Sequence, residues 1–471
     1  MKKKLLTLLL LGCIACGSFA ACGKKEFGAD NGTSTPPTSE NSQTSDGETS
    51  ENPKPEIEEI DYAGLVAEKF DLNSTATKKL EVSVKLFIDG DTTHFNVPKD
   101  VVSNGVLKAR YLAVDTPEST GKVQEWGKTA ANFTKSKLQS ATSIILETDG
   151  ADWEIDSTGE RRLVWVWYKP ASSTTYRNLN IEILQNGLAH ASNSAGNRYG
   201  EEYCMPAINQ AKALELHVYS DEKDPGFYYG DAVNLSLREL RMNIEDYDGI
   251  MVSYEGVITY GYNNGVYVES YDDETEIWYG MYAYFGFQMP GAALRILKPG
   301  NHVRIVGTVS EFSGSWQVSG LEFSYDPNVD ASLKLLDNEY HAPANVKTTV
   351  EKFNSNVTLE LEGQEPTAYP YAQLALHSSI VMNDLVVTKL YTTNNGGDSD
   401  GAISITCKQG DKTIVVRTNV MYDAEGNLIT QDVFQGKTID VKGIINYFQL
   451  NDDAEGSYQI NVFGMDYITI H

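Results

Sequence analysis

A segment of alternating apolar residues that ends in a tight turn is the feature that most limits how this chain can fold. From Glu81 to Ile88, aliphatic side chains occupy every second position, which is typical of a strand with one buried face. Asp89 and Gly90 come next and favour a hairpin turn, and residues 92–97 can form the returning strand. The segment therefore predicts a β-hairpin with one face in a hydrophobic core.

Further strand and helix patterns follow this hairpin. Trp126, Ala130 and Phe133 have helical spacing, and Gly187 interrupts or ends a second helical segment. The expected strands cover residues 82–88, 92–97, 106–114, 144–146 and 163–168, and two later helices cover residues 178–192 and 201–220. Together these elements predict a Greek-key barrel with packed helices, an OB-type fold, over residues 78–222.

A pattern of strands and glycines occurs twice in the C-terminal half. Gly300 and Gly307 are seven residues apart, as are Gly436 and Gly443, and apolar residues alternate around the second glycine of each pair. The two copies span residues 300–318 and 436–460 and follow strand-like runs at residues 252–268 and 380–405. The chain of 471 residues is thus expected to be mainly β with some α, with two OB-like β-barrels after the first barrel.

The N-terminus has the form of an export signal. The basic residues Lys2–Lys4 are followed by an apolar run. This run is far shorter than a membrane span, which needs about 20 apolar residues. Residues 19–25 resemble a bacterial lipobox, in which Cys22 becomes the lipidated first residue; Cys13 is the alternative. We expect a lipid-anchored protein on the extracellular face of the cytoplasmic membrane, as in Gram-positive surface lipoproteins.

Composition separates the predicted parts of the chain. Residues 26–60 are rich in Ser, Thr, Asn, Glu and Pro and have no apolar period, which is typical of a disordered acidic tether. The predicted parts are a signal peptide at residues 1–22, the tether at 23–77, the first barrel at 78–222, and the OB-like modules at 236–330 and 331–471. Past Cys22, the thiols are Cys204 and Cys407, so no disulfide framework is implied.

The net charge of −27 is unevenly distributed along the chain. Residues 78–220 hold 16 Lys and Arg against 17 Asp and Glu, whereas residues 221–471 hold 15 against 36. An acidic surface disfavours a polyanionic ligand. The first barrel, which is nearly neutral, is therefore the better candidate for a phosphate-containing substrate, provided that it binds a divalent cation.

Carboxylates and an arginine surround the predicted hairpin. Asp89 and Asp91 lie at its turn, and Arg110 precedes Asp115 by five residues. Thr116 comes before a proline, which biases it to an extended conformation in which its carbonyl can face an ion. Carboxylate and carbonyl oxygens are calcium ligands, and a guanidinium group pairs with phosphate. This stretch predicts metal-assisted phosphoryl chemistry.

Three motifs in this order resemble the staphylococcal nuclease family, over roughly residues 78–222. They are Asp89-Gly90-Asp91-Thr92, Arg110 with Asp115-Thr116-Pro117-Glu118, and Asn186-Gly187-Leu188-Ala189. The resemblance implies that Asp91, Asp115 and the Thr116 carbonyl hold Ca²⁺, with Asp89 close by. It also implies that Arg110 and a second arginine bind the scissile phosphate and that Glu118 acts on the attacking water.

The second arginine departs from the family pattern. In that family an aspartate is followed, after two residues, by Gly-Arg, whereas here Glu160 stands between Gly159 and Arg161-Arg162. Counting back from the strand at Leu163 selects Arg161, and another loop path would select Arg162. His94, His190 and His217 form no zinc-binding pair at motif spacing, so zinc chemistry is unsupported in this barrel.

The resemblance implies a Ca²⁺-dependent endonuclease of the thermonuclease type, which hydrolyses DNA and also RNA to 3′-phosphate products. The N-terminal pattern adds that this endonuclease is secreted and anchored to the membrane. The alternative is a surface lipoprotein that binds nucleic acid or another partner through a poorly active nuclease fold, and the extra Glu160 is its support. The C-terminal modules weakly resemble OB-type modules appended to secreted nucleases. Their aromatic residues are expected in the cores and at the rims of structural or partner-binding modules, and nucleic-acid or glycan binding is the alternative. The partner is unknown; these residues are Tyr260, Tyr262, Tyr267, Tyr271, Trp278 and Tyr279.

Overall fold

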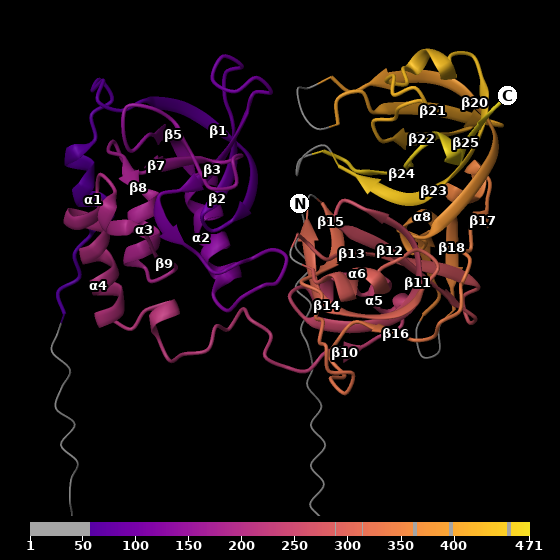
Figure 1. Ribbon diagram of the computed structural model, residues 1–471, viewed down its shortest axis with the longest axis horizontal. Coiled ribbons are helices and arrows are strands. Elements are labelled where there is room, and N and C mark those ends of the chain that lie inside the picture. Colours follow the sequence, from indigo (N-terminus) through magenta and orange to yellow (C-terminus); the bar gives the residue numbers. More distant parts are fainter. Residues whose placement is uncertain (1–56, 288, 313, 361–364, 395–398, 450–453) are drawn as a thin grey trace, which may run out of the picture. The chain divides into compact units, whose positions relative to one another are not determined.

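The computed structural model describes residues 57–471 except 288, 313, 361–364, 395–398 and 450–453. Within this part of the chain, the strands form three closed five-stranded barrels with short helices against them (Figure 1). The predicted fold class, mainly β with OB-type barrels, is confirmed. None of the helices in the described ranges is both long and apolar enough to cross a membrane.

The first barrel contains the predicted hairpin and closes between β3 and β7. Its strand order is β3-β2-β1-β5-β7, and β3 and β7 pair in parallel to complete the ring. The ring strands are β1 (Lys79–Asp89), β2 (Thr92–Asn96), β3 (Val106–Tyr111), β5 (Ala141–Glu147) and β7 (Arg162–Pro170). Short strands adjoin them at β4 (Ala113–Asp115), β6 (Glu154–Ile155), β8 (Arg177–Asn178) and β9 (His190–Ser192).

The strand expected over residues 106–114 is divided at Leu112. The amide of Leu112 donates to the carbonyl oxygen of Val164 at 2.9 Å, and Ala113 adopts a left-handed conformation with φ of 70°. After this break, β4 pairs with β9 instead of continuing along β2. The break places Asp115 beyond the edge of the barrel wall.

The three expected helices pack against the first barrel, and two of them are shorter than expected. They are α2 (Gly127–Gln139), α3 (Leu179–Gln185) and α4 (Met205–Ala213). Gly187 ends the segment of α3 with φ of 64°, and a β-carbon there would lie 2.4 Å from the carbonyl oxygen of Leu216. The helix predicted to reach residue 192 is therefore wrong after Gln185, because residues 190–192 form β9.

Residues 57–77 correct the predicted extent of the tether. They contain α1 (Tyr62–Leu65) and a 3-10 turn at Val66–Lys69, and the side chains of Ala63 and Val66 are fully buried. Asp61 pairs with Arg177 at 2.6 Å. The tether predicted to end at residue 77 is thus wrong for this segment, which packs on the first barrel. Cys13 and Cys22 lie outside the described residues.

The second and third barrels have the same topology, which confirms the repeat. In the second barrel the ring is β11-β12-β13-β15-β14, and in the third it is β20-β21-β22-β24-β23. The second barrel consists of β10 (Val233–Asn234), β11 (Met251–Tyr262), β12 (Gly265–Asp272), β13 (Ile277–Tyr284), β14 (His302–Phe312), β15 (Ser315–Ser319) and β16 (Lys334–Leu335), with helices α5 (Leu237–Met242) and α6 (Gly291–Ile296). The third consists of β17 (Val346–Lys347), β20 (Ser379–Thr392), β21 (Ile403–Gln409), β22 (Lys412–Thr418), β23 (Thr438–Phe448), β24 (Ser457–Val462) and β25 (Ile468–Ile470), with α7 (Val350–Phe353), α8 (Tyr371–Leu374) and the hairpin β18 (Asn356–Leu359) and β19 (Thr367–Pro370).

The repeated glycines serve the same purpose in both barrels. A β-carbon on Gly307 would lie 2.7 Å from the carbonyl oxygen of Ser319, and one on Gly443 would lie 2.4 Å from that of Asn461. Each glycine thus allows two neighbouring strands to approach closely, β14 and β15 in the second barrel and β23 and β24 in the third. β10 and β16 pair with strands of the second barrel, so its strands span residues 233–335 and the predicted bounds of 236 and 330 are too narrow.

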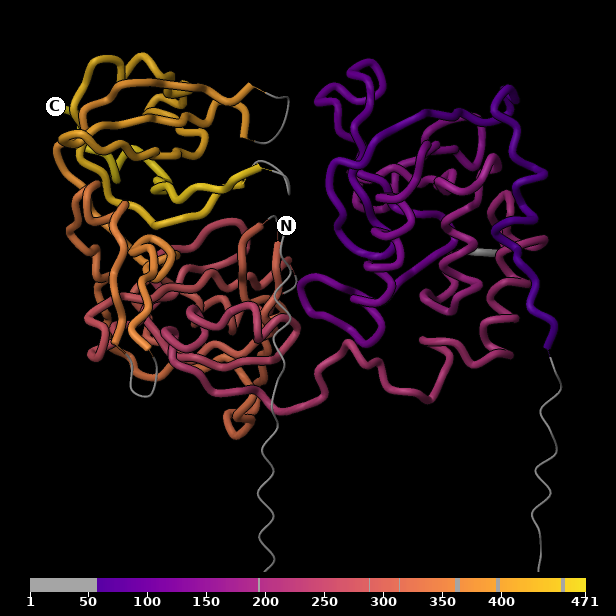
Figure 2. Tube along the Cα trace, turned by 180° about the vertical axis from the view of Figure 1, so that it is seen from behind, coloured from indigo at the N-terminus to yellow at the C-terminus, as the bar shows by residue number. Residues whose placement is uncertain are grey.

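The second and third barrels share one hydrophobic core and lie against each other in both views (Figures 1 and 2). The fully buried carboxylate of Glu269, on β12, accepts hydrogen bonds from the backbone N–H groups of Ala344 at 2.6 Å and Ser379 at 2.7 Å. Of the aromatic residues predicted in cores and at rims, Tyr267 and Tyr279 are buried, and Tyr271 is exposed.

Candidate active site

The turn between β1 and β2 is held tightly against its surroundings. The hydroxyl of Thr134, on α2, donates to the carbonyl oxygen of Gly90 at 2.6 Å. A β-carbon on Gly90 would lie 2.8 Å from Cγ2 of Thr116 and 2.9 Å from Cβ of Ala130. Glycine is therefore required for the turn to pack here, and this packing fixes Asp91 next to the segment that starts at Asp115.

Asp91 is fully buried and accepts three hydrogen bonds. Its Oδ1 accepts from Arg110 Nη1 at 2.6 Å and from the hydroxyl of Thr92 at 2.9 Å. Its Oδ2 accepts from the backbone N–H of Thr116 at 2.9 Å. The carboxylate thus joins the hairpin, β3 and the 115–118 segment into one site.

Arg110 bridges two of the predicted metal ligands. Its Nη1 contacts Asp91, and its Nη2 donates to Oδ1 of Asp115 at 2.5 Å. The Asp115 side chain is 58% exposed, whereas that of Asp91 is buried. One face of the site is therefore enclosed by protein and the other is open to solvent, as a site for a polymer substrate requires.

The site carries more negative charge than its arginine neutralises. Burial, together with the charge of Asp89, raises the pKa of Asp91 to about 7, although Arg110 and the N–H of Thr116 act in the opposite direction. Burial and the charge of Glu118 also raise the pKa of Asp89. A cation among these carboxylates would favour their ionised form.

The atoms around Asp91 suit a hard cation. Oγ1 of Thr116 is buried and has no hydrogen-bond partner among the described residues, so an oxygen ligand is available beside two carboxylates. Calcium takes six to eight oxygen ligands, which can include carboxylates, carbonyls and water. Asp91, Asp115 and Thr116 could hold such an ion, and Asp89 is close enough to add to its electrostatic field.

Glu118 is fixed through its backbone, while its side chain is exposed. Its N–H donates to the side-chain oxygen of Gln124 at 2.9 Å, and its carbonyl accepts from the N–H of Gln124 at 2.8 Å. Partial desolvation of the carboxyl group and the charge of Asp91 raise the pKa of Glu118, which Arg110 and Arg161 partly offset. The carboxylate forms no hydrogen bond or ion pair with another residue of the described ranges, so it can act on water.

The loop before β7 accommodates the extra residue. Asp156 Oδ2 accepts from Nε of Arg161 at 2.6 Å, and its N–H donates to the carbonyl of Arg161 at 2.9 Å. Glu160 instead pairs with Lys108 at 2.8 Å and is 67% exposed. The charge of Arg161 acts on Glu118, whereas Arg162 is the first residue of β7. Arg161 is thus the arginine whose charge lowers the pKa of Glu118, which favours it as the second arginine.

Asn180 supports the site and was not singled out from the sequence. This fully buried residue donates from Nδ2 to the carbonyls of Leu112 at 2.8 Å and Val164 at 3.0 Å, and its Oδ1 accepts from the N–H of Val166 at 2.9 Å. It thereby satisfies the backbone at the break between β3 and β4. The available signal was an amide between the apolar residues Leu179 and Ile181 at the start of α3.

A cleft adjoins the exposed side of the site. It has a volume of about 410 Å³, and it is lined by Asp115, Thr116, Pro117, Gln124, Glu125, Trp126, His190, Val218 and Ser220. His190 lies opposite Asp115 in the β4–β9 pair. A substrate that reaches Asp115 from solvent therefore has room for groups on one side of the reacting phosphate.

Two comparisons with known proteins agree on this part of the chain. The family described as staphylococcal nuclease homologues matches residues 108–220. A thermonuclease from Staphylococcus intermedius is 30% identical over 153 residues, which cover 32% of this chain and 82% of that protein. The similarity thus covers nearly the whole of a much shorter protein.

Proposed function

Because this chain belongs to the staphylococcal nuclease family, we propose that its first barrel is a Ca²⁺-dependent nuclease that hydrolyses DNA and RNA to 3′-phosphate products. The observation that carries the proposal is the pair of carboxylates, Asp91 and Asp115, joined by the fork of Arg110 beside Glu118. Asp115 and Thr116 also line the cleft beside this cluster.

In this proposal Asp91, Asp115 and the carbonyl of Thr116 hold the calcium ion, and Asp89 contributes charge nearby. A bound calcium ion supplies polarisation of a phosphoryl oxygen and positions for water and phosphate. Asp91 suits this role because its burial keeps competing solvent away, while the exposed Asp115 leaves the substrate side open. Loss of either carboxylate, that of Asp91 or that of Asp115, is expected to abolish calcium-dependent cleavage.

The side chains of Glu118, Arg110 and Arg161 have two further roles, which are activation of water and stabilisation of phosphoryl charge. Glu118 accepts the proton from water or orients it, a contribution of about 10²–10⁴-fold in rate. Arg110 has further N–H donors beyond the two that it gives to Asp91 and Asp115. These donors, with those of Arg161, stabilise charge on the phosphoryl oxygens as the 5′ oxygen leaves.

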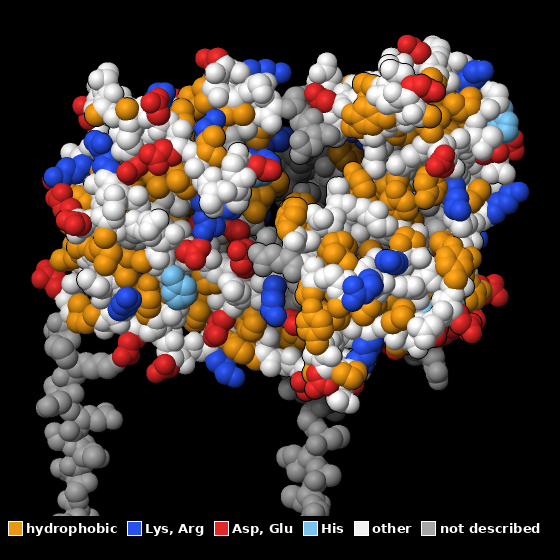
Figure 3. Space-filling model, viewed as in Figure 1, with side chains coloured by type: hydrophobic (Ala, Val, Ile, Leu, Met, Phe, Trp, Pro, Cys, Tyr) orange, Lys and Arg blue, Asp and Glu red, His pale blue; other side chains and the backbone are white. Residues whose placement is uncertain are grey.

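Substrate binding is expected to be weak. The first barrel is nearly neutral, and on the face that Figure 3 shows, Lys and Arg side chains are scattered among Asp and Glu instead of forming a broad basic surface. Few phosphate contacts then contribute to affinity beyond the active site, and screening weakens those that exist. Single strands and flexible ends fit a local site of this kind.

We also propose that the protein acts outside the cell, anchored by a lipid on Cys22. Support comes from the basic and apolar N-terminus and from the polar segment that follows it. The test is metabolic labelling with a fatty acid, which should be lost in Cys22→Ala and retained in Cys13→Ala. Labelling that follows Cys13 would assign the anchor to the alternative residue.

The nuclease proposal is tested with Glu118→Gln. We expect its cleavage of denatured DNA in Ca²⁺ to fall by about 10²–10⁴-fold, while calcium binding and the unfolding midpoint stay near those of the wild type. Glu154→Gln, at an exposed position on β6, is the matched control and should keep full activity. Tight DNA binding without turnover in the wild type would instead support the alternative, a nucleic-acid-binding lipoprotein.

A further inference from the structure

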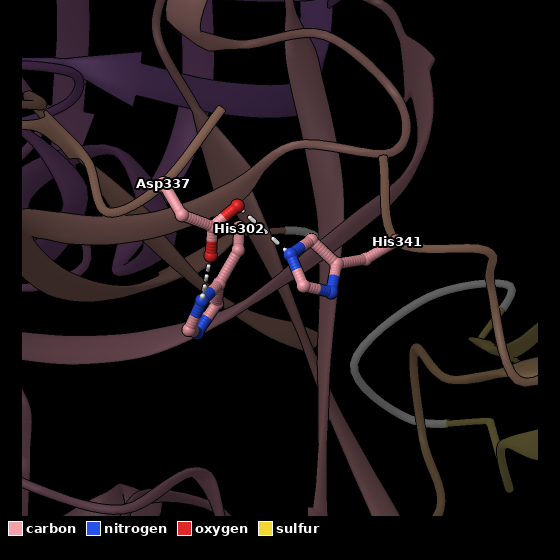
Figure 4. A group of neighbouring side chains, drawn as sticks. All are labelled: His302, Asp337 and His341. Carbon is pink, nitrogen blue, oxygen red and sulfur yellow. Dashed lines mark hydrogen bonds and ion pairs between the residues drawn. The ribbon is translucent and has the colours of Figure 1, made fainter. Parts of the chain in front are cut away.

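Two histidines and an aspartate converge on the second barrel, away from any motif found in the sequence. His302 is the first residue of β14, and Asp337 and His341 follow β16. Asp337 Oδ2 contacts Nδ1 of His302 at 3.1 Å, and its Oδ1 contacts Nε2 of His341 at 2.9 Å (Figure 4). One candidate ligand atom from each residue lies within 4.8 Å of the other two.

The backbone holds this cluster in place. The N–H of Leu336 donates to the carbonyl of His302 at 3.0 Å, and that of His341 donates to the carbonyl of Gly300 at 2.8 Å. The N–H of Glu339 donates to Oδ1 of Asp337 at 2.9 Å. The segment from 336 to 341 therefore wraps around the start of β14 with its ligand atoms already close together, so little ordering is left for a ligand to bring about.

We propose that His302, Asp337 and His341 form a binding site for a transition-metal ion of the zinc class. Two imidazole nitrogens and one carboxylate oxygen are the donors that zinc takes, usually with a fourth ligand in a tetrahedral arrangement. Each of the three side chains is about one-third exposed, from 33% to 35%, so water can complete the coordination. A bound metal ion would lie between the two imidazole nitrogens and the Asp337 carboxylate, and would replace the hydrogen bonds that now join them.

This donor set separates the site from the one in the first barrel. The Asp91 site offers only oxygen, which suits calcium, whereas two imidazoles disfavour calcium and favour zinc, cobalt or nickel. Asp337 supplies the single carboxylate of the set, and each of its two oxygens already lies beside an imidazole nitrogen, Oδ2 beside that of His302 and Oδ1 beside that of His341.

Metal binding would fasten the connection between the second and third barrels. Asp337 and His341 lie in the segment that joins β16 to β17, and His302 belongs to the barrel wall. A metal bound by all three ties the connecting segment to β14 by bonds stronger than the present hydrogen bonds. The inference concerns a structural metal and does not depend on the proposed nuclease activity.

The test is a calorimetric titration, in which Zn²⁺ is added to the purified, metal-stripped protein in the presence of excess Ca²⁺. We expect one zinc-class equivalent per chain, with affinity reduced by more than about tenfold in His302→Gln and in His341→Gln, since losing even an outer partner of a ligand costs about that much. His471→Gln is the matched control, because His471 also contacts a carboxylate, that of Asp440 at 3.1 Å. It should bind Zn²⁺ as the wild type does.

Cobalt provides an independent readout. Co²⁺ bound to this site should give visible absorption of a four- or five-coordinate nitrogen and oxygen complex, and His341→Gln should remove it. His341→Gln changes a side chain of the connecting segment, so it keeps the test valid if His302→Gln fails to fold. Absence of a zinc equivalent in the wild type, or binding that both variants leave unchanged, would overturn the proposal.

Discussion

Arg161 and Arg162 are adjacent in sequence but differ in their surroundings. Arg161 is tied to Asp156 at 2.6 Å and influences the carboxyl group of Glu118, whereas Arg162 pairs along β7 with Ala109 and Ile155. A bidentate contact with phosphate needs a guanidinium group, which lysine cannot replace. The choice between the two arginines thus depends on how the loop absorbs Glu160.

We predict that Arg161→Lys lowers kcat on denatured DNA by at least about tenfold, the loss of one charge-assisted hydrogen bond in the transition state. Arg162→Lys should change kcat less than about twofold. The measurement is steady-state cleavage at saturating Ca²⁺. A larger loss in Arg162→Lys than in Arg161→Lys would show that the other loop path is the functional one.

The buried Asp91 makes stability depend on pH when calcium is removed. Its pKa of about 7 in the folded chain lies above the ordinary value of about 3.9, so between these values the folded state binds more protons than the unfolded state. The free energy of unfolding therefore falls as pH rises through this window, by up to about 1.4 kcal/mol per pH unit.

Urea unfolding in chelator, followed by the fluorescence of buried Trp165 and Trp167, measures this slope. We predict that Asp91→Asn flattens it between about pH 4 and pH 7. Asp152→Asn, at a side chain that is 81% exposed, should leave it unchanged. An unaltered slope in Asp91→Asn would mean that another group causes the pH dependence.

At the scale of elements, the start of α2 fixes the position of Glu118. A β-carbon on Gly127 would lie 2.1 Å from the carbonyl oxygen of Glu118, so any larger residue must displace the helix or the segment that carries Glu118. Overpacking of this kind typically costs about 1–3 kcal/mol. Besides the hydrogen bond from Thr134 to Gly90, α2 thus supports the site through this backbone contact.

We predict that Gly127→Ala lowers the free energy of unfolding by about 1–3 kcal/mol and reduces kcat, because the carboxylate of Glu118 shifts. Gly150→Ala, where nothing lies within 4 Å of the new atom, is the matched control. Unfolding in urea and kcat are measured on both variants. Full activity in Gly127→Ala would show that Glu118 does not need this contact.

Sequence patterns predicted the elements that local rules determine. The alternation from Glu81 and the turn at Gly90 gave the hairpin, and the glycine spacing gave two equivalent barrels. Helix ends were less predictable, because Gly187 meets the carbonyl of Leu216 from a distant part of the chain. Likewise, the order of Arg110, Asp91 and Asp115 was readable, but the fork that joins them depends on β2 and β3 lying side by side.

At the scale of the molecule, the second and third barrels should behave as one unit. They share a core, and Glu269 on one accepts backbone hydrogen bonds from residues 344 and 379 beside the other. This coupling was not predictable from sequence, since a glutamate in the strand-forming run of β12 reads as a solvent-exposed residue. The cluster of His302 and His341 was not predictable from sequence either, because the rest of β14, β15 and β16 lie between these two residues.

We predict that Glu269→Ala lowers the stability of both C-terminal barrels together, by about 1–3 kcal/mol for each buried N–H left without an acceptor. Differential scanning calorimetry should show one transition for the two barrels, moved to lower temperature. Glu255→Ala, at an exposed position on β11, should have little effect. Two separate C-terminal transitions in the wild type would contradict a shared unit.

We propose that the charges gathered around Asp91 perform calcium-dependent phosphodiester hydrolysis. The most direct test is to incubate the protein with end-labelled denatured DNA in Ca²⁺ and then in chelator, and to identify the new ends. We predict cleavage in Ca²⁺ alone, with 3′-phosphate and 5′-hydroxyl ends. Cleavage that persists in chelator, or ends with 5′-phosphate, would contradict the account.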